Sequence, residues 1–350
     1  MKTVTLWGYY GYGNVGDEAI LASMLNLLGD VKVNLISGPT PSVEESENLR
    51  IIPRGIRRLV SSISKSNGFV LGGGGLVHDR INAKSTWYHL LGPSFSRFTN
   101  KPVAAIGQQI GPFYRNFTKK LVRYSLSKAT LTVRDQKSFS EAKLLGLNPI
   151  LSADMAFLLK IDEPSVEIAE KIKKLPKPVI IFAPGIDPRW TPTPERSAKI
   201  LEHFQKKTGG SVLFVPFFPV RDDDYIDEVQ KIRKIPGLVL KSPISWRDAF
   251  GCFLLSDISI PMRLHAMIAS ALAGLPMLPI PYYPKVPMIA SDLGVTSLLT
   301  HDDPNWQSKC DNFLKNMELV AVAVKNGAKK MADRAESSRN VLDTFINGLG

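Results

Sequence analysis

The sequence has few residues of the kinds that build a disulfide framework or a metal site. It contains two cysteines and five histidines in 350 residues. Cys252 and Cys310 lie far apart in the chain and form no C-x-x-C pair, so we expect neither a disulfide scaffold nor a zinc centre. This scarcity fits a reducing, cytoplasmic environment.

Long apolar stretches are also missing. No run of residues is apolar over the length that a bilayer-spanning helix needs. The N-terminus has one lysine and then a short strand-like run broken by glycines, without the apolar core and cleavage site of a signal peptide. We therefore expect a cytoplasmic protein that works in solution or at the inner face of the cell membrane.

Acidic residues are scarce in the first part of the chain. Residues 1–160 hold 20 Lys and Arg against 10 Asp and Glu, whereas residues 161–350 hold 24 against 22. A basic half indicates a polyanionic partner, such as nucleic acid, an anionic membrane or a diphosphate-linked substrate, or it is simply a soluble basic surface. Because no nucleic-acid-binding motif is present and aromatic residues are not interleaved with the charges, we do not expect nucleic acid.

The length and the apolar pattern predict two α/β domains. A chain of 350 residues exceeds the size at which one hydrophobic core keeps growing. Short β-branched runs alternate with helical periodicity, which is typical of parallel sheets covered by helices. Prolines around a short charged helix near residue 160 divide the chain into domains at 1–160 and 161–320 and a helical segment at 321–350. The expected strands are Thr3–Tyr9, Val31–Ile36, Gly68–Leu71, Pro102–Ile106, Thr130–Val133, Pro178–Ala183, Ser211–Pro216, Ile258–Ile260 and Met277–Ile280.

A glycine-rich loop follows the first expected strand. Gly11, Gly13 and Gly16 fit G-x-G-x-x-G at the start of a helix, where backbone N–H groups can approach an anion or a hydroxyl. The acidic residue that a dinucleotide site needs about 20 positions later is missing. Asp17 and Glu18 disfavour a pyrophosphate and favour recognition of a sugar hydroxyl. Asp17 is either a general base in the cleft or a cap of the helix.

A second loop contains the four consecutive glycines Gly72–Gly75. Such a run costs conformational entropy and indicates that a ligand or another backbone comes very close, or that the strand turns tightly into a helix. His78 and Asp79 follow it and are predicted to line the cleft, although a histidine here could also cap or pack.

Seven segments, in order, give the chain a family likeness. It resembles the polysaccharide pyruvyl transferases, because these segments match motifs of that family and occur in the family's order between residue 8 and about residue 286. One departure is Pro261, where family members often have glycine. The matching segments are Gly8–Ile20, Gly72–Asp79, Gly107–Pro112, Val133–Asp135, Ala153–Phe157, Met262–Ala266 and Tyr283–Val286.

The resemblance implies a fold, a reaction and which domain binds each substrate. The fold class would be α/β, with two Rossmann-like doubly wound domains facing a cleft, as in the glycosyltransferase-B enzymes. The reaction would be pyruvyl transfer from phosphoenolpyruvate to a hexose or N-acetylhexosamine of a cell-envelope polysaccharide precursor, forming a pyruvate ketal and phosphate, with no cofactor and no metal. The N-terminal domain would hold the acceptor, with candidate residues Asn14, Asp17, Glu18, Gly73, Gly74, His78 and Asp79.

The C-terminal domain would hold the donor. Arg263 and His265 follow an apolar strand and open a helix, so they lie at the carboxyl end of a strand. Arg263 can bind phosphate or carboxylate with two donors. His265 is our candidate general acid, since its ordinary pKa lies near neutrality. Arg134, also at a strand end, and Lys285 are further donor-binding candidates.

Other interpretations remain open at this point. The same architecture could belong to a nucleotide-sugar-dependent glycosyltransferase, because fold does not identify the donor. The acidic run Asp222–Asp224 is interpreted as a helix start and not as a metal site.

Residues 113–124 form a stripe of Phe113, Phe117, Leu121 and Tyr124 beside basic residues. With Arg54, Arg57 and Arg58, this helix could bring the protein to a lipid-diphosphate-linked sugar at an anionic membrane. Alternatively, the stripe packs on the sheet as in an ordinary helix.

Overall fold

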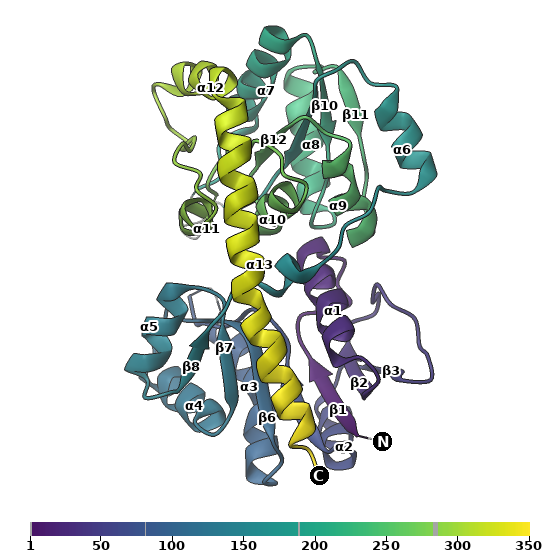
Figure 1. Cartoon of the computed structure of the whole chain (residues 1–350), viewed down its shortest axis with the longest axis vertical. Helices are drawn as coiled ribbons and strands as arrows, with labels where there is room; N and C mark the ends of the chain where they lie inside the picture. The colour runs from purple at the N-terminus through teal and green to yellow at the C-terminus, as the bar shows by residue number, and fades with distance from the viewer. Residues whose placement is uncertain (1, 81, 188–189, 283–285) are drawn as a thin grey trace. The chain divides into compact units, whose positions relative to one another are not determined.

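The computed structural model describes residues 2–80, 82–187, 190–282 and 286–350. These residues form two compact units, whose elements are labelled in Figure 1. The first unit consists of Met1–Tyr12, Asp17–Leu159 and Ala332–Gly350, and the second of Gly13–Gly16 and Lys160–Met331. The second unit resumes at Lys160, next to the boundary predicted from the sequence. Helix α13, Met317–Asn347, contributes its last turns to the first unit.

The first unit is built on a parallel sheet of eight strands in the order β3-β2-β1-β4-β6-β7-β8, with β5 paired to β6. All its strand pairs run parallel, so their carboxyl ends meet at one edge. The strands are β1 Thr3–Trp7, β2 Lys32–Ser37, β3 Leu49–Pro53, β4 Gly68–Leu71, β5 Gly74–Val77, β6 Val103–Ile110, β7 Thr130–Val133 and β8 Pro149–Leu151.

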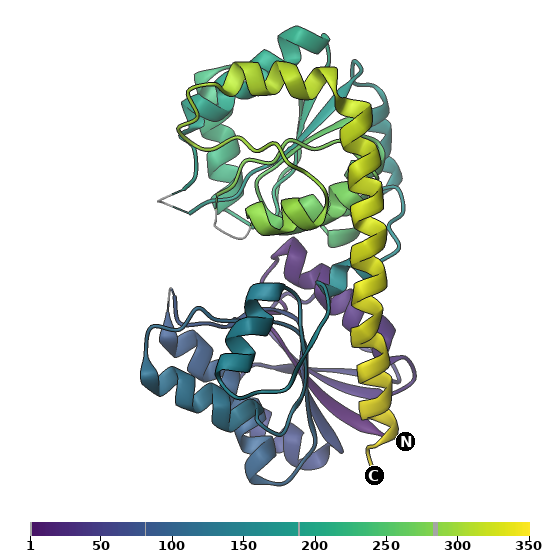
Figure 2. The ribbon, with the colours of Figure 1, turned by 60° about the vertical axis from the view of Figure 1, so that its left-hand side comes forward.

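Helices cover both faces of this sheet (Figure 2). One hydrophobic core joins the sheet to α2, α3, α4 and α5, and a second joins it to α1, the short helix η1 and the end of α13. Because both faces are covered, a central strand such as β6 is buried along all eight residues. The helices are α1 Val15–Leu28, α2 Ile56–Lys65, α3 Ala83–Phe98, α4 Asn116–Leu126, α5 Gln136–Leu144 and η1 Met155–Leu158.

The second unit has a parallel sheet of four strands in the order β11-β10-β9-β12. Its helix starts follow ordinary capping chemistry: Ser245, for example, accepts a hydrogen bond from the Asp248 amide at 3.0 Å at the start of α9. The elements are β9 Val179–Ala183, β10 Ser211–Phe214, β11 Gly237–Val239, β12 Ile258–Pro261, α6 Val166–Lys173, α7 Pro194–Thr208, α8 Arg221–Ile232, α9 Trp246–Leu254, α10 Leu264–Leu272, α11 Val286–Asp292 and α12 Trp306–Lys315.

The predicted fold class is confirmed, and eight of the nine expected strands are present with shifts at their ends. The prediction of a strand at Met277–Ile280 is wrong. The Leu278 and Ile280 amides donate to the Ser259 and Pro261 carbonyls, but the stretch forms an isolated bridge between Ser259 and Met277 and not a strand. The sequence analysis missed β3, β5, β8 and β11. These strands are short or partly exposed, so they lack the continuous apolar run used to find the others.

Among the helices of the described ranges, none combines the length and the hydropathy that crossing a bilayer requires.

Candidate active site

The loop after β1 is fastened by Glu18. Its carboxylate accepts hydrogen bonds from the Gly11 amide at 2.6 Å and from the Ser42 amide at 3.0 Å, and the side chain is only 4% exposed. Gly11 has a φ of 79°, a conformation that favours glycine. Glu18 therefore organises the loop, and its predicted contact with an acceptor stays a prediction.

The ring of Tyr10 occupies the space beside Gly8 and Gly72, so no side chain fits at either position. The ring is fully buried, and a Cβ atom added to Gly8 or to Gly72 would overlap it. Burial, with the charges of Asp17 and Glu18, raises the pKa of Tyr10 well above 10, so the phenol stays neutral. The first glycine of the second loop thus makes room for a side chain of the first loop.

Asp17 lies close to Gly74, the first residue of β5. The second half of the glycine run is therefore a strand and not a turn into a helix. A Cβ atom on Gly74 would lie 3.5 Å from Asp17 Oδ1, and the φ of Gly74 is 119°. Gly73 and Gly74 are buried, whereas Gly75 is exposed. The structure therefore brings Asp17, Gly73 and Gly74, three of the predicted acceptor residues, to one place at the carboxyl edge of the first sheet.

Arg134 is held at the same edge by a buried ion pair. Its Nη1 donates to Asp154 Oδ2 at 2.7 Å, and the two side chains are 9% and 3% exposed. Gln109 Oε1 accepts from Arg134 Nη2 at 3.4 Å. Gln108 donates to the carbonyls of Leu71 and Gly72 and so ties β6 to the glycine loop. The sequence analysis recognised these motifs but missed Asp154 as the partner of Arg134.

Asp79 and His78 occupy different environments. Asp79 is 1% exposed, and its carboxylate accepts from the amides of Tyr114 at 2.6 Å and Arg115 at 2.9 Å. It therefore fixes the segment that leads into α4. His78 is half-buried, and its carbonyl accepts from the Thr86 hydroxyl. The predicted roles of both residues in acceptor binding stay predictions.

Arg54, which follows β3, lies among aromatic rings. Its guanidinium carbon is 5.1 to 5.9 Å from the ring centroids of Trp7, Tyr9, Tyr12 and Tyr88. Its Nη2 donates to the Gly8 carbonyl. Tyr9 and Tyr12 stack with their centroids 4.8 Å apart. Arg54 thus belongs to a cluster of aromatic side chains and is itself half-buried, and its predicted role in reaching a membrane surface stays a prediction.

In the second unit, Arg263 is paired with Asp222. Arg263 Nε donates to Asp222 Oδ2 and to the Pro184 carbonyl, each at 2.9 Å, and its Nη2 donates to Asp222 Oδ1. Asp222 is fully buried and also accepts the amides of Phe217 and Phe218 at 2.9 Å. The acidic run at the start of α8 therefore supplies the partner of Arg263, which the sequence analysis did not foresee.

His265 lies in the first turn of α10, just after Arg263, which is the N-cap residue. A Cβ atom on Gly16 would overlap its imidazole, so glycine at this position makes room for His265. Asn14 Oδ1 accepts from the Gly16 amide at 3.2 Å. Asn14 thus belongs to the second unit, as do Arg263 and His265. Its predicted role in acceptor binding stays a prediction. Lys285 lies outside the described residues.

Comparisons with known proteins identify a family and a fold. A family model described as polysaccharide pyruvyl transferase matches residues 14–283. None of the curated protein sequences compared with the chain matches it.

Solved structures show the fold, which is that of the GT-B glycosyltransferases and related epimerases. MnaA of S. aureus, solved with UDP, has a TM-score of 0.66 at 10% identity, covering 98% of this chain and 95% of that chain. UDP-N-acetylglucosamine 2-epimerase from Rickettsia bellii has a TM-score of 0.64 at 8% identity, covering 99% and 97%. A ugt transferase from Siraitia grosvenorii, also solved with UDP, has a TM-score of 0.60 at 13% identity, covering 100% of both chains.

Proposed function

The chain belongs to the polysaccharide pyruvyl transferase family, and on that basis we propose that it transfers the pyruvyl group of phosphoenolpyruvate to a sugar. The acceptor is a hexose or N-acetylhexosamine of a cell-envelope polysaccharide precursor, either free or carried on a lipid diphosphate. Two hydroxyl groups of this sugar become bridged by a pyruvate ketal, and inorganic phosphate is released.

The observation that carries the proposal is the arrangement of Arg263 and His265. Both residues lie where β12 passes into α10, at the carboxyl end of a parallel strand, which is where α/β folds bind ligands. The start of a helix favours an anion, and an arginine there adds two directed donors. A doubly charged phosphate and a carboxylate are the two anionic groups of phosphoenolpyruvate, and they suit this position.

The chemistry needs an acid and a base. His265 donates a proton to the methylene carbon of the enol, and the adjacent carbon becomes an oxocarbenium-like centre. One sugar hydroxyl adds to that centre and loses its proton to a base, for which Asp17 is our candidate. The bond from this carbon to the phosphate oxygen then breaks, and the second hydroxyl adds in its place. The proton of the second hydroxyl goes to the departing phosphate, and the proton taken by the base returns to His265, which restores the acid.

The first unit offers groups that suit a sugar acceptor. Asp17 lies at the carboxyl edge of the first sheet, close to Gly74 at the start of β5. Tyr12, 36% exposed and stacked on Tyr9, offers a flat apolar surface beside the Arg54 guanidinium. A sugar has both apolar C–H faces and hydroxyl groups, so aromatic rings next to a carboxylate and a guanidinium can bind it.

Acceptor-dependent phosphate release from phosphoenolpyruvate tests the proposal. The purified protein is incubated with hexoses, N-acetylhexosamines and their lipid-diphosphate-linked forms, and products are measured by mass. A product heavier by a ketal-linked pyruvate, formed with one equivalent of phosphate, supports it. Turnover of a nucleotide sugar, with no phosphate release from phosphoenolpyruvate, would overturn it in favour of a glycosyltransferase of the same fold.

A further inference from the structure

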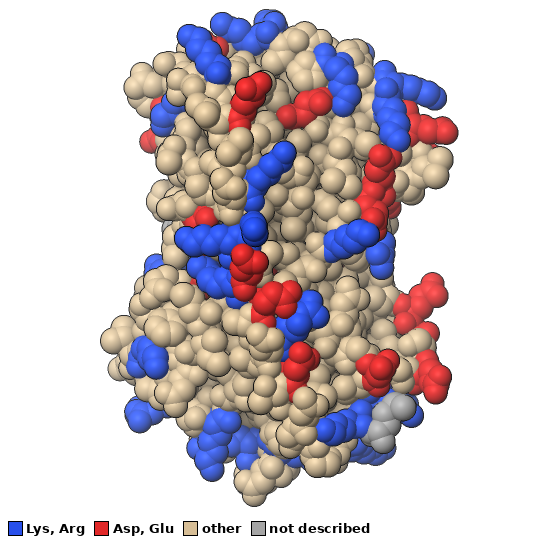
Figure 3. All heavy atoms as spheres, viewed as in Figure 1, with Lys and Arg blue, Asp and Glu red and all other residues tan. Residues whose placement is uncertain are grey.

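A long segment of the first unit carries only positive charge. From Arg80 to Arg134 the sequence has ten Lys and Arg and no Asp or Glu. This segment includes α3 and α4, which pack against each other on one face of the sheet. In Figure 3 the visible edge of the unit over α4 shows blue side chains and no red ones. The surface of this helix pair is therefore cationic.

The same two helices expose apolar side chains. Phe98 of α3 is 77% exposed, Phe117 of α4 is 60% exposed, and Tyr114, just before α4, is 71% exposed. Leu91 and Tyr124 are exposed as well. The interpretation that the stripe on α4 packs on the sheet is wrong for Phe117 and Tyr124, because Thr118, Val122, Ser125 and Leu126 take the buried positions instead.

Contacts between the helices hold these side chains in one surface. Trp87 of α3 donates to the Thr118 hydroxyl at 3.0 Å, and its ring meets the Phe117 ring edge-on at 5.2 Å. The hydroxyls of Ser94 and Ser125 are 2.7 Å apart. Arg97 lies 4.6 Å from the centre of the Tyr124 ring and donates to the Tyr124 carbonyl. Contacts within the helix pair therefore hold Phe117 and Tyr124 in place at its surface.

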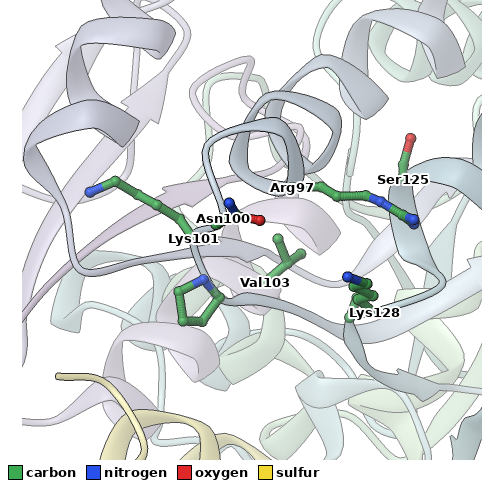
Figure 4. A pocket seen from close by; sticks show the side chains of 8 residues that line it. Arg97, Asn100, Lys101, Val103, Ser125 and Lys128 are labelled. Atoms are coloured by element: carbon green, nitrogen blue, oxygen red, sulfur yellow. The ribbon is translucent and has the colours of Figure 1, made fainter.

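A basic pocket lies at the far end of the pair, close to Tyr124. It has a volume of about 210 Å³, and its lining includes Arg97, Lys101 and Lys128 (Figure 4). Arg97 and Lys101 donate to backbone carbonyls, which fixes their charges in place. Positive charge thus extends from the start of α4 to the ends of both helices.

We propose that this α3–α4 surface docks on an anionic lipid bilayer. Exposed aromatic and leucine side chains with lysines and arginines, and without acids, are the composition of an interfacial helix. The positive charge attracts anionic headgroups, and the aromatic rings enter the interfacial region. A second copy of this chain is a poor occupant, because two such cationic surfaces would repel each other.

This inference deepens the proposed function and rests on it for its biological meaning. Tyr114 and Arg115 begin the docking surface, and their amides bind the carboxylate of Asp79, next to the Gly72–Gly75 loop. Docking would therefore keep the carboxyl edge of the first sheet beside a bilayer, where a sugar on a lipid diphosphate is found. The binding itself needs neither substrate, so it is measured separately from catalysis.

The test is co-sedimentation of the full chain with vesicles of phosphatidylglycerol and phosphatidylcholine, compared with vesicles of phosphatidylcholine alone. We expect binding to the anionic vesicles that weakens at high salt, and little binding to the neutral ones. Each basic residue near an anionic surface strengthens binding about fivefold. The triple variant Lys119→Gln, Lys120→Gln, Lys128→Gln is therefore expected to bind more than tenfold more weakly.

The matched charge control is Lys199→Gln, Lys231→Gln, Lys234→Gln, which removes three exposed lysines from the second unit. It is expected to bind like the parent chain. The aromatic variant Phe98→Ser, Phe117→Ser tests the apolar part, with Leu144→Ser, Val166→Ser as its control, since all four side chains are more than half exposed. The aromatic variant is expected to lose at least tenfold in affinity.

Two results would overturn the proposal. In the first, each variant binds vesicles as tightly as its control, or the chain binds neutral and anionic vesicles equally. In the second, the chain forms a dimer in solution that the aromatic variant abolishes, which would assign the surface to a second copy. Unchanged circular dichroism and thermal midpoint of the variants exclude misfolding as the cause of lost binding.

Discussion

Arg263 donates hydrogen bonds from Nε and Nη2 to the carboxylate of Asp222, which is fully buried. The rings of Phe218 and Tyr282 lie 5.7 and 5.8 Å from the guanidinium carbon. The guanidinium therefore has a fixed plane before any ligand arrives, which lowers the entropic cost of binding one. Arg134 and Asp154 form a second buried ion pair, in the first unit, through Arg134 Nη1.

The first prediction concerns this ion pair. In Asp222→Asn the buried negative charge that Arg263 Nε and Nη2 contact disappears. Because removing one partner of a buried pair is costly, we expect the free energy of unfolding to fall by about 3 kcal/mol. Chemical denaturation measures this change, and phosphate release from phosphoenolpyruvate should fall at least tenfold. Asp224→Asn, at an exposed position of the same helix, is the control. Equal stability of the two variants would contradict the role given to Asp222.

The second prediction concerns Gly16. An alanine there would push its Cβ atom into the His265 imidazole. We expect Gly16→Ala to displace His265 and to lower kcat at least tenfold, with a much smaller effect on the thermal midpoint. Gly348→Ala, where the added atom makes only ordinary contacts, should keep full activity. Near-normal turnover of Gly16→Ala would show that the space Gly16 leaves for His265 is not needed for the reaction.

The third prediction concerns the general acid. His265→Ala should reduce turnover by a factor of roughly 10²–10⁴, the usual contribution of acid catalysis, while binding of phosphoenolpyruvate is largely kept. Steady-state kinetics combined with calorimetry of phosphoenolpyruvate binding separates the two effects. Turnover near that of the parent chain would remove His265 from the mechanism.

The fourth prediction concerns pH and His89. Burial and the nearby charge of Arg54 lower the pKa of His89 to about 4, and its Nδ1 lies 2.8 Å from the Ser85 carbonyl. In the unfolded chain the imidazole of His89 has a pKa of about 6.5. The contribution of neutral His89 to the free energy of unfolding is therefore fully present above that pH and is lost as the pH falls towards 4. Between pH 7 and pH 5, His89 alone should lower the free energy of unfolding by about 2 kcal/mol.

The matched variant is His89→Gln, which keeps a donor for the Ser85 carbonyl but has no proton to gain. Denaturant titrations at pH 7 and pH 5 should show a smaller loss of unfolding free energy in the variant than in the parent chain. The same loss in both would show that His89 is not the responsible group.

Several site features could be found from sequence because they are local. The Gly11, Gly13 and Gly16 spacing and the position of Arg263 and His265 after an apolar run mark strand-to-helix transitions. Asp135, directly after β7, caps α5 and accepts from the Ser138 amide at 2.7 Å. Capping and strand-end positions depend on residues a few places apart, so the linear pattern contains them.

Other features depend on pairs that are distant in the chain. Asp222 meets Arg263 across 41 residues, and Tyr10 fills the space above Gly72. No spacing rule predicts such pairs, because they form only when strands of a sheet are set side by side. The exposure of Phe117 could not be predicted for the same reason, because the helix pattern alone does not say which side of α4 packs on the sheet.

By itself, the sequence determined the α/β class, the motif order that shows the family, and the types of residue available for proton transfer and anion binding. Tertiary structure decided which charges are paired, which glycines make room for a side chain and which aromatic residues stay exposed. The physical reason is that periodicity and capping are set by neighbours along the chain, whereas burial and ion pairing are set by neighbours in space.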